Sequence, residues 1–112
     1  MAQKAAEVAL TGSQECVAQM KEVFAQRREL ICRLASEIPG FRFNKPQGAF
    51  YLFPDVRAIG SGDEVAQRLL DEAHVAVVSG SAFGCPSCIR LSYAISTEEI
   101  EEAMRRIRNC LC

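Results

Sequence analysis

The sequence predicts a single α/β (α+β) sandwich domain, in which helices cover a small mixed or antiparallel sheet of about four strands and a long helix comes first. Three observations lead to this fold. The chain of 112 residues is the size of one domain. Two Ser-x-x-Glu capping boxes mark the starts of amphipathic helices. Short stretches rich in β-branched and aromatic residues lie between the helical segments, and a sheet covered by helices is the economical way to pack that order.

The first third of the chain is predicted to be helical. Residues 3–10 have the composition of a helix end, which Thr11-Gly12 breaks. From Ser13 to Ile38, apolar side chains recur every three or four residues with one gap at Arg27 and Arg28; they are Val17, Met20, Phe24, Ile31, Leu34 and Ile38. At about 1.5 Å per residue this helix would be about 35 to 40 Å long, which exceeds what one small core needs. We therefore expect it to join the domain to something else, and Pro39-Gly40 to end it.

Two short strands are expected next. Residues 41–44 and 49–53 are rich in aromatic side chains, and residues 45–48 between them form a turn. Ser61 and Glu64 then begin a helix whose apolar face extends to residue 73.

Two further strands and a last helix complete the predicted fold. Residues 75–78 and 89–95 are strand-like because of their β-branched content. The segment between them, residues 79–84, lacks the lysine of a phosphate-binding loop and precedes a strand, so we expect a tight connection. Ser96 and Glu99 begin the last helix.

Charge and hydropathy exclude several classes of function. Thirteen basic residues against 14 acidic ones give no basic excess for nucleic acid. The apolar runs are far shorter than the roughly 20 residues that span a bilayer, and the first ten residues lack the apolar segment of a secretory signal. Six cysteines without an export signal favour free thiols. We expect a cytoplasmic protein with no nucleic-acid or membrane partner.

Arg90 is the first candidate for a binding residue. In the last predicted strand, Arg90 shares a face with the small residues Ser92 and Ala94, while larger apolar residues take the opposite face. Small neighbours leave room for a ligand, and a guanidinium offers two parallel N–H donors that match a carboxylate or a phosphate. The residues alone nevertheless favour a simpler interpretation, in which Arg90 is solvated or pairs with a glutamate of the domain.

The sequence Cys85-Pro86-Ser87-Cys88 has the spacing of a dithiol redox motif or of half a zinc site. A strand follows the pair, so the helix N-terminus that activates a redox cysteine is absent. Cys110 and Cys112 at a helix end would be poor additional zinc ligands, and His74 is better explained as a cap or a packing residue. We expect incidental thiols and no metal site.

Five motifs occur in a fixed order along the chain. They are Arg27-Arg28-Glu29, Ile38-Pro39-Gly40, PQGAFYLFP at residues 46–54, Ser81-Ala82-Phe83-Gly84 and IRLSYA at residues 89–94. Together they resemble the C-terminal small domain of the class I and II (fold type I) pyridoxal-phosphate-dependent aminotransferases, in the aspartate-aminotransferase-like subgroup. The resemblance covers about residues 3–110. It implies that residues 1–12 end a helix of the large domain, and that residues 13–112 form the small domain with a connector helix over residues 13–38.

The resemblance also implies a role for particular residues. The position of Arg90 is the one that holds the α-carboxylate of the substrate in this family, and Phe50 takes the place of an aromatic residue near the substrate pocket. Gly48 and Gly84 match positions where the backbone turns or approaches a neighbour. Cys85 to Cys88 stand where glycines are common, and Ser79 where proline is frequent, so substrate preference can differ from that of other members.

The implied activity is transamination between aspartate, or a related amino acid, and a 2-oxo acid, in a homodimeric enzyme that uses pyridoxal 5'-phosphate. The lysine that forms the Schiff base and the acidic partner of the pyridine nitrogen belong to the large domain of the family. Lys4, Lys21 and Lys45 do not match that lysine. We therefore expect no catalytic or cofactor-binding residue in this chain, no bound cofactor, and no activity of the chain alone.

Two other functions remain open from the residues. The domain could be a non-catalytic interaction module that keeps the fold and binds a partner through apolar surface on its first two helices. Less favoured is a zinc or redox protein based on its cysteines.

Overall fold

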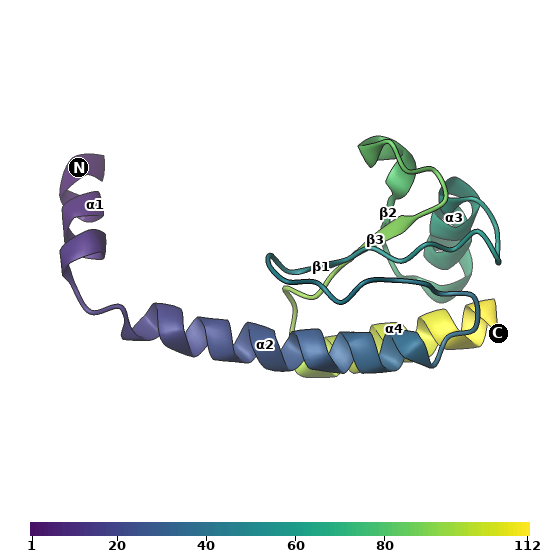
Figure 1. Ribbon diagram of the computed structural model, residues 1–112, viewed down its shortest axis with the longest axis horizontal. Coiled ribbons are helices and arrows are strands. Elements are labelled where there is room, and N and C mark those ends of the chain that lie inside the picture. The colour runs from purple at the N-terminus through teal and green to yellow at the C-terminus, as the bar shows by residue number, and fades with distance from the viewer.

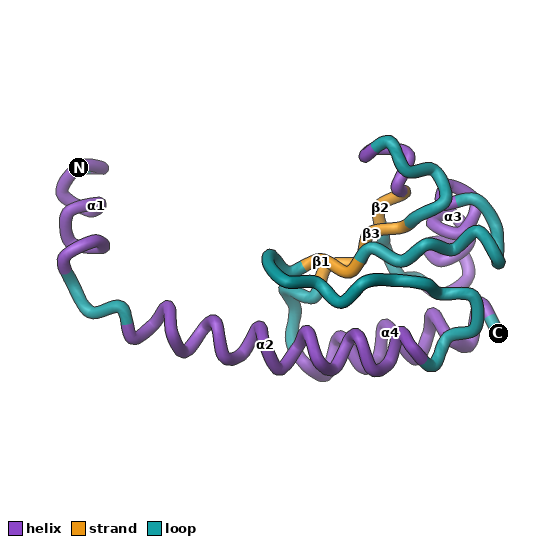
Figure 2. The backbone as a smooth tube through the Cα atoms, viewed as in Figure 1, coloured by secondary structure: helices purple, strands orange, loops and turns teal.

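The computed structural model describes all 112 residues and contains four α-helices, one short 3₁₀ helix and three short strands (Figures 1 and 2). In chain order these elements are α1 (Ala2–Thr11), α2 (Glu15–Ser36), β1 (Tyr51–Leu52), α3 (Gly62–Ala73), β2 (Val78–Ser79), η1 (Gly80–Phe83), β3 (Ile89–Ser92) and α4 (Thr97–Leu111).

The three strands form an antiparallel sheet with β3 in the centre, in the order β1-β3-β2. Tyr51 lies opposite Ser92 in the pairing of β1 with β3, and Val78 lies opposite Arg90 in the pairing of β2 with β3. Helix α2 runs alongside α4 beneath the sheet, and α3 packs against α4 and β2 (Figure 1). The molecule therefore has two layers, a sheet and a layer of helices.

The hydrophobic core lies between these two layers. Fifteen buried side chains form one cluster, with members from α2, α3, α4 and the sheet. The sheet contributes Leu52, Ile89, Leu91 and Tyr93, all at most 5% exposed. These residues alternate with exposed or half-buried ones, so one face of the sheet packs on the helices and the opposite face is left open.

The first 23 residues make no part of this core. Every residue from 1 to 23 is exposed, and α2 buries only Ile31 and Ala35 in its second half. We call residues 1–23 the N-terminal arm and residues 24–112 the compact region. The arm projects away from the compact region (Figure 1) and gives the molecule its longest dimension of 49 Å. The prediction of a helix longer than the core requires is confirmed.

The sheet has three strands, and the predicted number of four was wrong. Residues 41–44 form only a single bridge, in which Arg42 exchanges backbone hydrogen bonds with Asp55. Residues 75–77 are not paired, and β2 begins only at Val78; the Val75 amide donates to the carbonyl of Leu69 and completes the end of α3. Val75 and Val77 instead pack against the core.

Both predicted capping boxes are present. Ser61 and Ser96 accept hydrogen bonds from the amides of Glu64 and Glu99, whose carboxylates accept in return from the serine amides. His74 ends α3 in the left-handed conformation, with φ of 54°, so its predicted role as a cap is confirmed.

Candidate functional site

Arg90 lies on the open face of the sheet, in the central strand. The alternation that buries Ile89 and Leu91 turns Arg90 away from the core. Because residues opposite each other in a β-ladder point to the same side, the pairing of β1 with β3 places Tyr51 on this open face as well. The prediction that Arg90 lies on the face opposite the large apolar residues of its strand is thus confirmed.

Two aromatic rings pack against the guanidinium group of Arg90. Its carbon lies 4.3 Å from the ring centre of Tyr51 and 4.5 Å from that of Phe83. Phe53 in turn meets Phe83 edge to face, with ring centres 6.0 Å apart. Cation–π contacts of this kind stabilise an arginine by about 0.5 to 2 kcal/mol, depending on exposure. These two contacts hold the guanidinium in place without using its N–H groups as hydrogen-bond donors.

No carboxylate of the domain pairs with Arg90. The nine ion pairs of the chain all involve other lysines and arginines, and the Arg90 side chain donates no hydrogen bond within the domain. The only buried side-chain polar atoms without a partner belong to Arg27 and Arg28, so the donors of Arg90 reach solvent. Of the two simpler interpretations of Arg90, the internal ion pair does not occur in this structure, whereas the solvated arginine is compatible with it.

Phe50 lies at the end of the sheet, in the turn before β1. Its ring stacks on Phe24 of α2 at 5.8 Å and contacts the ring of Tyr51 at 4.7 Å, and it remains 38% exposed. The Tyr93 hydroxyl donates to the carbonyl of Ala49 at 3.2 Å and so fixes this turn. Phe50 and Arg90 are therefore linked through Tyr51, which touches both.

The glycine predictions are confirmed in part. Gly84 ends η1 with φ of 75°, a conformation that favours glycine. At the other turn the positive φ belongs to Ala49 (56°) and not to Gly48, around which there is open space.

The six cysteines are free, and no three His, Cys, Asp or Glu side chains are arranged to hold a metal ion. Cys110 contacts Glu72 and is not brought together with Cys85 and Cys88. Cys85 and Cys88 do lie side by side, with their sulfur atoms 2.9 Å apart.

The three lysines lie on the surface. Lys4 pairs with Glu7 and Lys45 with Glu29, while Lys21 is exposed on the N-terminal arm. A Schiff-base lysine works from a setting that lowers its pKa, through burial or a neighbouring cation. The residues of this chain therefore do not fit pyridoxal phosphate as a covalently held group.

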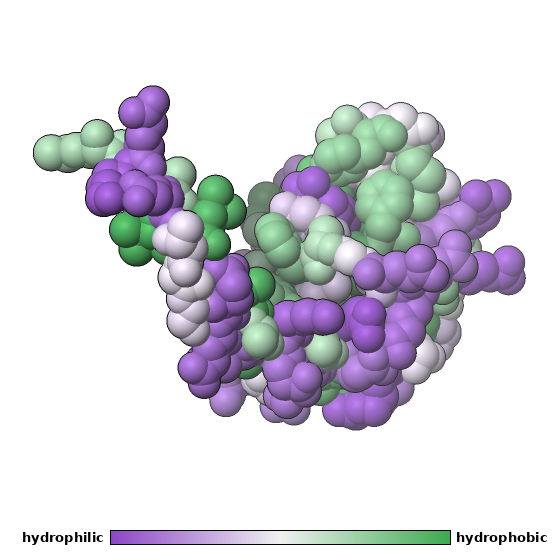
Figure 3. Space-filling model, turned by 60° about the vertical axis from the view of Figure 1, so that its left-hand side comes forward, coloured by the Kyte–Doolittle hydropathy of each residue, from purple (hydrophilic) through white to green (hydrophobic).

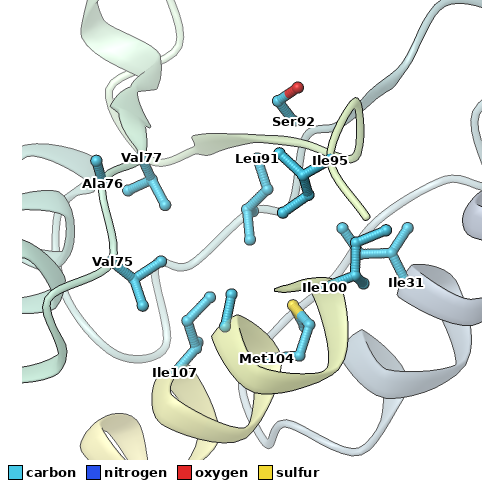
Figure 4. A pocket seen from close by; sticks show the side chains of 11 residues that line it. Ile31, Val75, Ala76, Val77, Leu91, Ser92, Ile95, Ile100, Met104 and Ile107 are labelled. Atoms are coloured by element: carbon cyan, nitrogen blue, oxygen red, sulfur yellow. The ribbon is translucent and has the colours of Figure 1, made fainter. Parts of the chain in front are cut away.

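A small apolar cavity of about 70 Å³ lies between the sheet and α4. Ile100, Met104 and Ile107 point into it from α4, toward Leu91 and Val75 (Figure 4). Its lining carries no charged group, so it is part of the packing between the layers and does not suit a charged amino acid. None of the helices is both long enough and apolar enough to span a membrane.

Sequence reasoning missed the aromatic neighbours of Arg90. Tyr51 and Phe83 are about 40 and 7 positions away along the chain, and only the pairing of β1 with β3 and the fold of η1 bring them to the guanidinium. The available signal was the alternation in residues 51–53, where Tyr51 and Phe53 flank the buried Leu52.

The family to which this fold belongs is shown by comparison with known proteins. The model of the family "Aminotransferase class I and II" matches residues 1–107. The chain belongs to the class I and II aminotransferases. Among curated relatives, it is 51% identical over 111 residues to an aspartate aminotransferase of Bacillus sp. (strain YM-2), covering 94% of this chain and 28% of that protein. It is 50% identical to the aspartate aminotransferase of Geobacillus stearothermophilus, in a match that covers 96% of this chain and 29% of that protein.

Solved structures of aminotransferases contain the same fold. The aspartate aminotransferase from Rhizobium meliloti superposes with a TM-score of 0.93 at 36% identity, over 97% of this chain and 30% of that one. The aspartate aminotransferase from Thermotoga maritima superposes with a TM-score of 0.86 at 40% identity, over 96% of this chain and 27% of that one. The chain thus spans less than a third of the length of these relatives, and it corresponds to part of an aminotransferase.

Proposed function

We propose that this chain is the C-terminal small domain of a pyridoxal-phosphate-dependent aminotransferase, and that Arg90 holds the α-carboxylate of the amino-acid substrate. Residues 1–12 would end a helix of the large domain, and residues 13–112 would form the small domain. The complete enzyme would be a cytoplasmic homodimer that transaminates aspartate or a related amino acid with a 2-oxo acid. This proposal accounts for the relatives named above and for the arm that reaches beyond the core.

The observation that carries the proposal is the state of Arg90. It is a cation on the open face of the sheet, held against two aromatic rings and without a carboxylate partner in the chain. A carboxylate that approaches this face can accept two parallel N–H bonds from the guanidinium. Such a pair fixes the orientation of a small zwitterion and leaves its amino group free to react, which is what positioning a substrate requires. Phe50 would line the same site through its contact with Tyr51.

Family membership implies that the complete enzyme depends on pyridoxal phosphate, which supplies the electron sink for transamination. Since no lysine of this chain fits the covalent linkage, the reactive amine would come from the large domain. The purified chain with added pyridoxal phosphate should then form no 2-oxo acid from aspartate. Formation of 2-oxo acid by the chain alone would contradict the assignment of the reactive lysine to the large domain.

The test of Arg90 uses the complete enzyme that contains this domain. Arg90→Ala should weaken binding of the amino acid by about 10- to 150-fold, because charge-assisted hydrogen bonds contribute about 1.5 to 3 kcal/mol. Arg90→Lys should restore only part of this affinity, since lysine keeps the positive charge but lacks the two parallel N–H donors of a guanidinium. Both are measured by titrating the absorbance of the bound cofactor with amino acid.

Arg105→Ala is the matched control. Arg105 is an exposed arginine on α4 that pairs with Glu102, far from the open face of the sheet, and its replacement should leave the titration unchanged. In all variants the cofactor spectrum without substrate should match that of the parent enzyme. Equal amino-acid affinity of parent and Arg90→Ala enzyme would rule out the assigned role.

A second candidate function is favoured by the N-terminal arm. Val8, Leu10, Val17 and Met20 are 58 to 82% exposed there, and Figure 3 shows apolar side chains gathered on this arm. An exposed apolar surface of this kind suits a non-catalytic module that binds another protein. Static light scattering of the purified chain distinguishes the cases, because a clean monomer at high concentration would count against an interaction module.

A further inference from the structure

Cys85 and Cys88 lie at the two ends of a tight turn between η1 and β3. The Cys88 amide donates to the Cys85 carbonyl at 3.0 Å, which closes the turn, and Pro86 occupies its second position. A turn of this kind keeps its end Cα atoms within about 7 Å, close to the range of about 4.4 to 6.8 Å that a disulfide spans. The two sulfur atoms are already in contact, 2.9 Å apart.

The rest of the domain holds this turn in place. The turn makes four backbone hydrogen bonds of 2.7 to 2.9 Å to other segments, from Val56 to Ser87, from Gly62 to Pro86, from Gly80 to Cys88 and from Cys85 to Gly80. A Cβ atom at Gly62 or Gly80 would overlap the carbonyl oxygen of Cys88, so the backbones meet closely on both sides. The thiols are therefore brought together by the fold around them.

The two thiols differ in access. Cys85 is half-buried, whereas Cys88 is only 6% exposed. Burial raises the pKa of the Cys88 thiol, and its hydrogen bond with Cys85 acts in the same direction. Ser87 lies 3.9 Å from both sulfur atoms and accepts a hydrogen bond from Arg57. A reagent that comes from solvent would meet Cys85 first.

We propose that Cys85 and Cys88 form a dithiol site that a small-molecule disulfide converts reversibly into an intramolecular disulfide. Cys85 loses its proton and attacks one sulfur of the reagent, which releases one thiol and leaves a mixed disulfide. Cys88 then loses its proton and attacks the sulfur of Cys85, which releases the second thiol. The protein gives up two electrons and two protons, and the reagent accepts both. The exchange needs only this chain, so it is independent of the role proposed for Arg90.

The test uses the purified 112-residue chain in buffers with increasing ratios of oxidised to reduced glutathione. Thiol exchange is stopped with acid, the free thiols are then blocked at neutral pH with an excess of a fast alkylating reagent, because the thiolate is the form that reacts, and the chain is digested with trypsin. Cleavage after Arg68 and Arg90 gives a peptide of residues 69–90 that contains both cysteines and none of the other four. This peptide should become two hydrogen atoms lighter and resist alkylation, and a dithiol reductant should reverse the change.

The native fold should favour the disulfide. Half-oxidation of peptide 69–90 should need a ratio of oxidised to reduced glutathione that is about tenfold lower for the folded chain than for the chain in urea. The unfolded chain keeps the two cysteines only three positions apart, whereas the fold holds their sulfur atoms in contact. Cys88→Ser should stop the reaction at a glutathione adduct on Cys85. Cys110→Ser with Cys112→Ser is the matched control and should leave peptide 69–90 unchanged.

Three results would overturn the proposal. Peptide 69–90 could remain fully alkylated under conditions that oxidise Cys110 and Cys112, or it could carry glutathione on both cysteines. Equal half-oxidation ratios for the folded and the urea-treated chain would show that the turn contributes nothing.

Discussion

The N-terminal arm and α4 carry the same kind of apolar stripe, but only α4 buries it. On α4, Ile100, Met104 and Ile107 are at most 3% exposed, because α2, α3 and the sheet lie against them. On the arm, Val17 and Met20 are 58% and 59% exposed. The comparison shows that helical periodicity identifies the face of a helix that will pack, while burial depends on the partner. In the proposed enzyme, the large domain would be that partner.

The largest expected difference between the two regions is in stability. Leu69→Ala removes a fully buried side chain from α3 and should lower the free energy of unfolding by about 2 to 5 kcal/mol. Leu10→Ala makes the same change at a position that is 82% exposed on the arm, and it should have an effect within about 0.5 kcal/mol. Urea denaturation followed by circular dichroism measures both. Similar losses for the two variants would mean that the arm is part of the cooperative core.

The second effect concerns the close backbone contact beside the Cys85–Cys88 turn. Gly80→Ala places a methyl group against the carbonyl of Cys88, and overpacking of this kind costs about 1 to 3 kcal/mol. Gly48→Ala is the control, since nothing lies within 4 Å of the position that its Cβ would take. The urea midpoint of Gly80→Ala should be lower than that of Gly48→Ala. An unchanged midpoint for Gly80→Ala would show that η1 can shift to make room for the methyl group.

The third effect comes from the capping boxes of the compact region. Ser96→Ala should cost about 1 kcal/mol, because the amide of Glu99 loses its acceptor. Hydrogen bonds from the backbone and side chain of Ser96 lower the pKa of the Glu99 carboxyl group in the folded protein. A lowered folded-state pKa contributes stability above the unfolded-state value of about 4.3, and this stability is lost as the pH falls below it.

The pH dependence of this cap can be isolated. The free energy of unfolding should fall on acidification below about pH 4, and Glu99→Gln should flatten part of that slope. Glu101→Gln on the same helix is the control, since no ion pair or hydrogen bond of its side chain is present. Equal slopes for the two variants would show that Glu99 titrates normally.

The smallest effect is expected on the arm itself. Deletion of residues 1–12 removes α1, which buries no residue, so the urea midpoint of the compact region should stay unchanged. The deletion should nevertheless reduce any self-association seen by light scattering, because Val8 and Leu10 are lost from the surface. A lower midpoint would indicate that α1 folds back onto the compact region.

The helices could be predicted from the sequence because their signals are local. The capping boxes at Ser61 and Ser96, the stop at Pro39-Gly40 and the excess length of α2 are all visible in short windows of sequence. Strands were predicted less well. Residues 41–44 have strand composition, but pairing depends on distant segments, and the structure provides only the bridge at Arg42.

The candidate site shows the same limit. The alternation in residues 89–92 was enough to place Arg90 on the open face, and the motif around it suggested what it binds. The rings of Tyr51 and Phe83 could not be assigned to it, because their contacts arise from the register of β1 with β3 and from the turn of η1. Similarly, Cys85 and Cys88 have the spacing of a dithiol motif, but the sequence favoured incidental thiols. The contact of their sulfur atoms and the close backbone approach of Gly62 and Gly80 emerge only in the fold.

The positive charge of Arg90 lies against two neutral aromatic rings and is paired with no acid of the domain. A guanidinium without a carboxylate partner presents its N–H donors to any small anion that reaches it. If Arg90 binds a carboxylate as proposed, chloride, phosphate and other small anions of the medium should compete for the same donors, and the affinity for that carboxylate should fall as ionic strength rises.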